Sequence, residues 1–157
     1  MLHDPAVQAR FEPGTSVIVG TASSDGEPYA TRAFSVAPTS DDWHRVRVAV
    51  AADDAGPTSC LSPGAQVAIT GADVCTLLSA QLKGTVALVE PPTEADLERA
   101  HHHMHRLAEL IEETDGTDRG LVLRMFPARL LAIEVEVHEQ YDQSPGPEAG
   151  AALGRRR

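Results

Sequence analysis

The sequence predicts a mainly β domain in which antiparallel strands form a barrel or a sandwich and one helix packs across it. Three observations support this prediction. Hydrophobic residues alternate along several segments, above all along Leu78–Glu90 (LSAQLKGTVALVE). Turn sequences such as Asp25-Gly26 separate these segments. A single long stretch, which begins at Thr93, has the hydrophobic spacing of three and four residues that is typical of an amphipathic helix.

The composition is that of a soluble globular protein with an acidic surface. The chain has 157 residues, of which 42% are hydrophobic and 23% are charged, and this suits one domain with a sizeable core. Its formal net charge of −10 would repel a phosphate backbone, so we expect no nucleic-acid partner. No apolar run approaches the roughly 18 residues of a membrane span, and the N-terminus lacks a signal-peptide pattern. We therefore expect a single domain over residues 1–157, no membrane partner and a cytoplasmic location.

The first half of the chain predicts three strands in a meander. Each strand is a short run of β-branched or alternating residues, and turn-forming residues such as Asp25-Gly26 separate the runs, because glycine accepts the positive φ of a tight turn. In the third strand Val46, Val48 and Val50 alternate toward the core. The predicted strands are Ser16–Ala22, Tyr29–Ala37 and Arg45–Ala51.

The second predicted strand carries a charged residue on a face that is otherwise apolar. Arg32, Phe34 and Val36 are spaced by two residues and should lie on the same side of the strand. A buried guanidinium without a partner is costly. Three environments are therefore open for Arg32: a sheet edge, an ion pair with a carboxylate, or contact with an anionic ligand.

The second half of the chain predicts two further strands, a helix and a final strand. Residues 53–64 contain two prolines and two glycines and should form a loop with at most one helical turn at Ser59–Leu61. The helix begins at Thr93, which forms a capping-box pattern with Asp96, and it ends near Gly116. The predicted strands are Gln66–Thr70, Leu78–Glu90 and Ala128–Gln140, which complete a core over about 16–142, and residues 143–157 should be an extended Pro- and Gly-rich C-terminal arm.

The long predicted strand Leu78–Glu90 has one apolar and one polar face. Ser79, Gln81 and Lys83 place a hydroxyl, an amide and an ammonium on the polar face, about 7 Å apart. Such a row can bind a polar ligand, or it can simply face solvent, as is common in antiparallel sheets. The opposite face carries Leu78, Ala80, Leu82, Gly84, Val86 and Leu88.

With its elements in this order, the chain resembles the pyridoxamine 5′-phosphate oxidase-like FMN-binding split barrels. The likeness extends from about Ser16 to Gly150 and implies a six-stranded antiparallel split β-barrel of Greek-key type, with one amphipathic helix between strands five and six. It also implies a homodimer that holds FMN in grooves between its subunits and acts as an oxidoreductase on a small molecule. A dimer would cover apolar surface that six strands and one helix leave exposed. The likeness rests on TRAF at Thr31–Phe34, VAIT at Val67–Thr70, QLKG at Gln81–Gly84 and DQSPGPEAG ending at Gly150.

The resemblance assigns cofactor-binding roles to residues of three strands. Arg32 corresponds to the arginine that contacts the flavin phosphate in the family, which would explain its position. No residue is singled out as catalytic, because a bound flavin carries out the chemistry itself. Ala33, Phe34 and Ser35 would follow the isoalloxazine edge. Val50 and Ala51 would touch the phosphate and ribityl chain. Ser79 would contact the flavin, and Gln81 and Lys83 share its face of the strand.

Two features depart from the family pattern. Ala55, Gly56 and Pro57 stand where the family has a serine and a lysine as phosphate ligands, and the loss of two such contacts weakens FMN binding by about 10²-fold or more unless other groups compensate. The C-terminal tryptophan and arginine of true pyridoxamine phosphate oxidases are also absent, so we do not expect that reaction. Relatives of this fold bind a deazaflavin coenzyme, haem or no cofactor. The alternative is therefore a cofactor-poor, deazaflavin-binding or haem-binding split barrel with a binding or sensing role.

The HHHMH sequence at residues 101–105 has the spacing of a metal site. On a helix, His101 and His105 lie one turn apart, with Glu98, Glu109 and Glu112 on the same flank. Two histidines at this spacing beside carboxylates can bind a divalent metal. However, the flank borders solvent and the sequence specifies no third ligand. We therefore predict that this segment is an ordinary helix surface and that the chain has no functional metal site.

Overall fold

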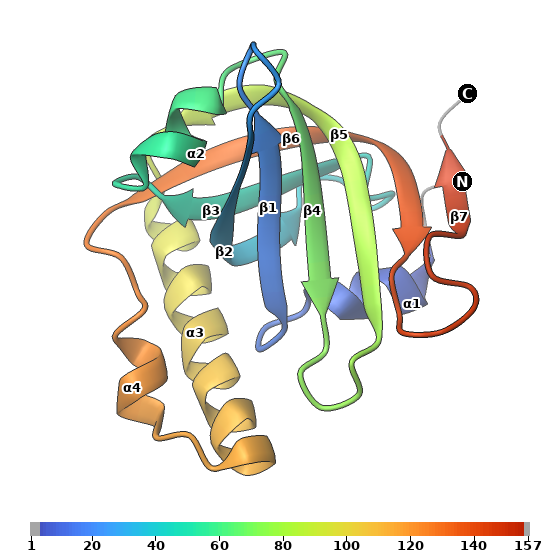
Figure 1. Cartoon of the computed structure of the whole chain (residues 1–157). Coiled ribbons are helices and arrows are strands. Elements are labelled where there is room, and N and C mark those ends of the chain that lie inside the picture. Colours follow the sequence, from blue (N-terminus) through green and yellow to red (C-terminus); the bar gives the residue numbers. More distant parts are fainter. Residues whose placement is uncertain (1–3, 156–157) are drawn as a thin grey trace.

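Six strands close into an antiparallel barrel in the computed structural model, which describes residues 4–155 (Figure 1). The strands are β1 (Ser16–Ala22), β2 (Pro28–Pro38), β3 (Arg45–Ala51), β4 (Gln66–Ala72), β5 (Ser79–Glu90) and β6 (Leu130–Asp142). Their order in space is β3-β2-β1-β4-β5-β6, and β3 pairs with β6 to close the barrel. Because β4 returns to lie beside β1, the topology is a Greek key. The predicted six-stranded antiparallel barrel is confirmed.

The barrel core is built mainly from β-branched side chains. Val46, Val48 and Val50 are each 0% exposed, so the predicted inward alternation of β3 is confirmed. Val17 of β1 and Leu82 of β5 belong to the same cluster of buried residues. Each fully buried side chain of this size contributes about 1.5 to 3 kcal/mol to the stability of the fold. The short alternating runs of the sequence thus place enough apolar surface inside the barrel to hold it closed.

A β-bulge in β2 changes the direction of its side chains. The pairing of β2 with β3 slips between Ala33 and Ser35, which leaves Phe34 as an extra residue. Phe34 packs outside the barrel, whereas Ala33 and Val36 belong to the barrel core. The prediction that Arg32, Phe34 and Val36 share one face was therefore wrong, because strict alternation requires an unbroken ladder.

A similar irregularity ends the apolar face of β5. The pairing of β5 with β6 slips between Val86 and Leu88. Leu88 is 40% exposed, and Val89 packs against the barrel core in its place. The predicted apolar face holds between Ala80 and Val86, but it was wrong for Leu88, and Leu78 at the other end is also exposed.

The helix α3 (Glu94–Asp115) packs on the outside of the barrel against β2 (Figure 1). The Thr93 side chain accepts a hydrogen bond from the Asp96 backbone, and the Asp96 side chain accepts one from the Thr93 backbone, so the predicted capping box is confirmed. The helix ends at Gly116, whose φ of 78° is in the left-handed region that glycine adopts readily. Its buried face contributes Met104 and Leu107 to a second hydrophobic cluster, which includes Phe34 of β2.

A network of ion pairs joins the start of α3 to the barrel. Nε of Arg47 on β3 donates to both carboxylate oxygens of Asp96 at 2.9 Å, and Nη1 of Arg47 donates to Glu90 at 2.7 Å. Arg99 pairs with the same Asp96 carboxylate. Burial by itself would raise the pKa of Asp96, but the hydrogen bonds from Arg47 and Thr93 more than offset burial and hold that pKa well below its ordinary value. Asp96 is therefore charged and paired while almost fully buried.

The shorter elements lie at the two ends of the chain and in the connections. The predicted helical turn at Ser59–Leu61 begins earlier, as α2 (Ala55–Cys60). The predicted extended C-terminal arm instead folds back as β7 (Ala152–Arg155), which pairs with the end of β6 because that end presents an otherwise unpaired edge; residues 156–157 of the arm lie outside the described residues. The remaining elements are α1 (Pro5–Gln8), η1 (Ala9–Phe11) and α4 (Arg119–Leu123).

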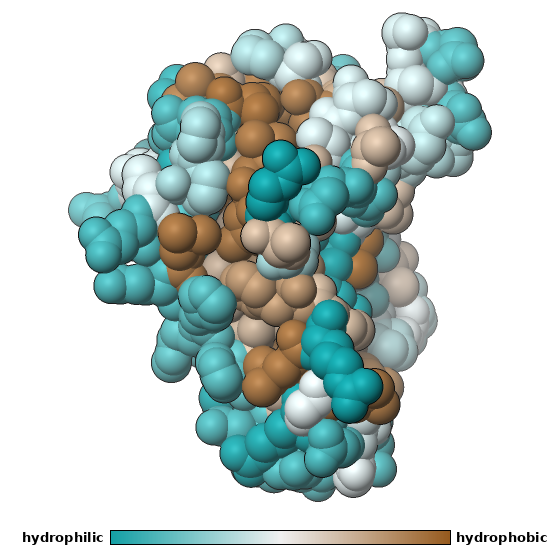
Figure 2. Space-filling view, turned by 90° about the vertical axis from the view of Figure 1, so that its left-hand side faces the viewer, coloured by the Kyte–Doolittle hydropathy of each residue, from teal (hydrophilic) through white to brown (hydrophobic). Residues whose placement is uncertain are grey.

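The side of the molecule that carries α4 exposes apolar side chains. Leu121 of α4 is 54% exposed, and the nearby Met125 is 44% exposed. Figure 2, which views the molecule from the left of Figure 1, shows apolar surface as a band between hydrophilic side chains. In the part of the chain that the structure describes, no helix is both long and apolar enough to cross a membrane.

Candidate functional site

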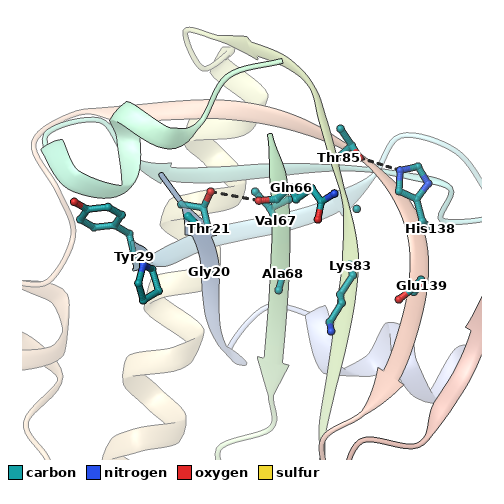
Figure 3. Close-up of a pocket in the computed structure, with 13 residues that line it drawn as sticks. Gly20, Thr21, Tyr29, Gln66, Val67, Ala68, Lys83, Thr85, His138 and Glu139 are labelled. Carbon is teal, nitrogen blue, oxygen red and sulfur yellow. Dashed lines mark hydrogen bonds between the residues drawn. The ribbon is translucent and has the colours of Figure 1, made fainter. Parts of the chain in front are cut away.

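The outer surface of β1, β4, β5 and β6 carries a groove of about 500 Å³ (Figure 3). Gly20 of β1 and Ala68 of β4, which are cross-strand neighbours, form its floor. A Cβ atom at Gly20 would have only the Ala68 carbonyl oxygen within 4 Å, at 3.8 Å, so the space directly above this glycine is open. The volume lies within the range of roughly 300 to 1,000 Å³ that small-molecule sites occupy.

An aromatic residue closes one end of the groove and polar residues line the other. The ring of Tyr29 lies over Gly56 of α2, where a Cβ would be only 2.8 Å from the ring. Lys83, His138 and Glu139 line the groove on β5 and β6. Figure 3 shows Tyr29 and His138 on opposite sides of the floor. A bound molecule would thus meet an apolar surface at one end and charged or hydrogen-bonding groups at the other.

Lys83 brings a positive charge to the groove. Its Nζ lies 4.7 Å from the centroid of the Tyr141 ring, in a cation–π contact. The Tyr141 hydroxyl donates a hydrogen bond to the carboxylate of Glu139. Among residues 4–155, Lys83 forms no ion pair. Its charge is therefore available to an anionic ligand.

The three predicted polar residues of β5 lie on its outer face but in different surroundings. The Gln81 amide donates to the Thr70 hydroxyl at 2.9 Å. The Ser79 hydroxyl donates to the Leu77 carbonyl at 2.8 Å, and Ser79 lines a separate depression beside α1 and the C-terminal arm. Of the three, Lys83 is the one that lines the groove.

Arg32 lies on the outer face of β2 and does not line the groove, and its charge acts on His103 of α3. It is a cross-strand neighbour of Ile18 on β1, and the same row continues through Thr70 to Gln81. Three strand spacings separate Arg32 from Gln81, a distance of roughly 14 Å. β2 lies between β1 and β3, and Arg32 forms no ion pair within residues 4–155. At Arg32 itself, however, the ladder has a partner on β1 only, because the pairing of β2 with β3 begins at Ala33. Of the three environments that the sequence left open, the described residues thus show no ion pair, and the sheet edge and the anionic ligand both remain.

The other predicted coenzyme contacts are turned away from the groove in the single chain. Ala33 and Val50 pair across β2 and β3 and point into the barrel core. Phe34 packs with α3, Ser35 is buried, and Ala51 packs against the α3 side of the barrel. The structure therefore brings together only part of the predicted set, and the coenzyme contacts of these residues stay a prediction.

The structure adds His138 and Tyr29, which sequence reasoning did not select. The Oγ1 atom of Thr85 and Nε2 of His138 are 3.1 Å apart, and both residues line the groove. Tyr29 reaches the groove from the start of β2. No local signal identifies either residue, because their positions depend on how distant strands pair.

The histidines of α3 have separate environments. His101 is exposed and stacks on Phe126 with ring centroids 4.4 Å apart, and His105 is exposed to solvent. His103 is 2% exposed, and burial lowers its pKa to about 4 although its ring is hydrogen-bonded to the Thr15 backbone. Within residues 4–155, no group of three or more histidine, cysteine, aspartate or glutamate side chains is arranged to hold a metal ion.

Solved structures of other proteins share this fold. No protein-family model and no curated protein matches the sequence. HupZ of Group A Streptococcus is similar with a TM-score of 0.55 and 14% identity, covering 94% of this chain and 99% of that one. A putative pyridoxamine 5′-phosphate oxidase from Lactobacillus delbrueckii is similar with a TM-score of 0.54 and 15% identity, and the match covers 88% of this chain and 93% of that one. An F420 reductase is similar with a TM-score of 0.53 and 17% identity, and the match covers 88% of this chain and 98% of that one.

At these identities the likeness shows the fold and nothing finer. The shared features are a closed antiparallel barrel of six strands and near-complete coverage of both chains. The extra strand β7 is an addition to this barrel. The chain therefore has the split-barrel fold of the pyridoxamine 5′-phosphate oxidase-like proteins.

Proposed function

We propose that the chain is a homodimeric oxidoreductase that binds a flavin-type coenzyme, FMN or a deazaflavin, on the groove face of its barrel. The observation that carries this proposal is the groove of about 500 Å³, whose floor of Gly20 and Ala68 is nearly free of side chains. A planar ring can lie on such a floor. Lys83 beside it is a cation without a carboxylate partner in residues 4–155, and it can hold an anionic group.

The fold supports this choice of ligand. The proteins of similar structure include a putative pyridoxamine 5′-phosphate oxidase and an F420 reductase, and each covers 88% of this chain. The sequence resemblance independently favours FMN. Haem and cofactor-poor functions also occur on this fold, so the choice depends on the groove of this chain rather than on the fold alone.

The groove fits the ring of such a coenzyme better than its phosphate. Ala55, Gly56 and Pro57 offer no polar side chain to a phosphate, and Tyr29 covers Gly56. Arg32 and Lys83 are the cations on this face that remain for an anionic group. A charge-assisted hydrogen bond contributes about 1.5 to 3 kcal/mol, so two of them can support binding of moderate affinity.

The contribution of the chain to the reaction is binding and orientation. A bound flavin or deazaflavin would supply the hydride transfer. Lys83 and Arg32 would hold the negatively charged part of the coenzyme, while Tyr29 and the floor at Gly20 and Ala68 would set the plane of its ring. The open side of the groove would be covered by the second subunit, which excludes water from the site.

The groove is open in the single chain, and this favours a two-fold dimer. Ile18, which lies on the same face beside Arg32, is 38% exposed. A partner subunit that packs on this face would bury Ile18 and enclose both grooves. Light scattering at micromolar concentration should give twice the mass of one chain. A monomer mass under these conditions would contradict the dimer.

Parallel titrations with FMN and with the deazaflavin coenzyme F420 test the proposal. Binding of either coenzyme should be saturable and should reach one molecule per chain, as followed by absorbance and fluorescence of the coenzyme. Protein purified from cells should be yellow if FMN is the natural ligand. A colourless protein that takes up neither coenzyme at high micromolar concentration would overturn the proposal.

A second candidate is a split barrel that binds or senses a small molecule without a tightly held flavin. Two observations favour it. The segment Ala55 to Pro57 lacks phosphate ligands, and the carboxylate of Glu139 lies on the rim of the groove, where it would repel an anion. This candidate predicts no uptake of FMN and a groove that still binds an uncharged or cationic molecule.

A further inference from the structure

His138 enters the groove because β6 contains an extra residue. Lys83 of β5 pairs with Glu139, but the next residue, Gly84, pairs with Val137, so His138 has no partner in the ladder. In a regular strand, Val137 and Glu139 would share one face and His138 and Gln140 the other. Instead, Val137 and Gln140 are buried in the barrel, and His138 and Glu139 both face the groove.

Such an arrangement is costly for the sheet and is typical of functional sites. A β-bulge disrupts the ladder locally, and bulges are common beside binding sites, where they redirect a side chain. Here the bulge places two consecutive polar side chains in the same groove (Figure 3). A strand without the bulge would present only one of them.

Thr85 holds the imidazole of His138 in position. Nε2 of His138 lies 3.1 Å from the Thr85 hydroxyl, which can either donate or accept this hydrogen bond. Nδ1 of His138 forms no hydrogen bond with another of residues 4–155. Because the hydroxyl suits both tautomers of the ring, Nδ1 can offer a ligand either a proton or a lone pair.

We propose that His138, held by Thr85, contacts the polar edge of the coenzyme ring. This edge of a flavin or deazaflavin carries N–H donors and C=O acceptors in one plane, and an imidazole nitrogen that can take either role matches it. Lys83 lies two residues from Thr85 on the same face, about 7 Å along the strand, and would contact the charged part of the coenzyme. The assignment rests on the proposed function and adds the part of the groove that recognises the ring.

Binding of FMN and riboflavin to variants separates a ring contact from a phosphate contact, because riboflavin has the same ring and no phosphate. His138→Ala should weaken the binding of both ligands by the same factor, roughly 5- to 15-fold. Lys83→Ala should weaken FMN binding on the order of 10-fold and leave riboflavin binding nearly unchanged. Dissociation constants are measured by quenching of flavin fluorescence.

Two further variants serve as controls. Thr85→Val keeps the shape of residue 85 but removes the hydroxyl that holds the imidazole, so it should cause a smaller loss for both ligands and no additional loss in combination with His138→Ala. His105→Ala removes an exposed histidine of α3 outside the groove and should change neither affinity. Urea unfolding of each variant verifies that its fold is retained.

Two results would overturn the assignment while the proposed function stands. In the first, His138→Ala binds both ligands as well as the parent protein does. In the second, the loss is confined to FMN, which would make His138 a phosphate contact. A parent protein that binds neither FMN nor F420 would instead overturn the proposed function, and the assignment of His138 with it.

Discussion

The start of α3 and the groove face of the barrel use positive charge in opposite ways. At the start of α3, Arg47 is 11% exposed in its side chain and is surrounded by the carboxylates of Asp96, Glu90 and Glu134. On the groove face, Arg32 and Lys83 have no carboxylate partner in residues 4–155. A chain with a formal net charge of −10 has enough carboxylates to pair every cation. Arg32 and Lys83 are therefore open to an anion, as the proposed function requires, whereas Arg47 serves the fold.

The largest expected effect is a loss of stability when the ion-pair network at the start of α3 is broken. Asp96→Ala removes both a helix cap and the main partner of Arg47, and it leaves a nearly buried guanidinium with weaker partners. We expect the free energy of unfolding to fall by about 3 to 5 kcal/mol, as measured with urea at pH 7. Glu94→Ala, an exposed change in the same turn, is the control and should alter that energy by about 0.5 kcal/mol or less. Equal stability of the two variants would show that the network contributes little.

The next effect concerns His103, which is buried between α3 and the barrel. Its folded pKa of about 4 lies below the ordinary value of 6.5, so folding favours the neutral ring. The stabilising contribution is complete above pH 6.5 and is lost as the pH falls toward 4, by up to about 3 kcal/mol. The pKa of Asp96 is lowered below 3.8, so its ion pairs persist through this window.

Urea unfolding at pH 7.0 and pH 4.5 tests this expectation. The parent protein should lose stability between the two values, and His103→Gln should lose much less, because glutamine does not titrate. For each protein, the quantity compared is the change in the free energy of unfolding between pH 7.0 and pH 4.5. A destabilisation by the substitution that is the same at both pH values therefore does not affect the comparison. An equal loss in both proteins would assign the pH dependence to other groups.

For the cations of the groove face, which have no carboxylate partner in residues 4–155, we expect a substitution to change coenzyme affinity and to leave the stability of the fold unchanged. Arg32→Ala should lower FMN affinity by about 2 to 3 kcal/mol, on the order of 30- to 150-fold, through the loss of a charge-assisted contact. Its free energy of unfolding should remain close to that of the parent, since no ion pair within residues 4–155 is broken. If Arg32→Ala unfolds the protein, or binds FMN like the parent, Arg32 is a structural residue and the proposed anion site is wrong.

Lys83 should give the smallest of these effects. Its ammonium is flexible, matches a phosphate less well than a guanidinium does, and gives up a cation–π contact with Tyr141 to reach a ligand. Lys83→Ala should therefore cost less FMN affinity than Arg32→Ala, about 10-fold. Isothermal titration of both variants under the same salt conditions gives the order directly. The reverse order would place the phosphate at Lys83 rather than at Arg32.

Much of the fold follows from local sequence patterns. The inward alternation of Val46, Val48 and Val50 depends only on the two-residue period of a strand. The capping box of Thr93 and Asp96 depends only on a spacing of three residues. The predicted strand bounds agree with the structure to within one or two residues, because hydrophobic runs and turn residues mark them. By itself, the sequence thus determined the six barrel strands, the long helix α3 and the acidic character of the protein.

The tertiary structure decided which of these residues meet. The bulge at Phe34 arises in the pairing of β2 with β3 and the bulge at His138 in the pairing of β5 with β6, and each shifts side chains to the opposite face of the sheet. The absence of carboxylate partners for Arg32 and Lys83 within residues 4–155 likewise depends on which strands become neighbours. A local pattern specifies the direction of a side chain only while the ladder is regular, so the groove and its polar residues could be located only in the folded barrel.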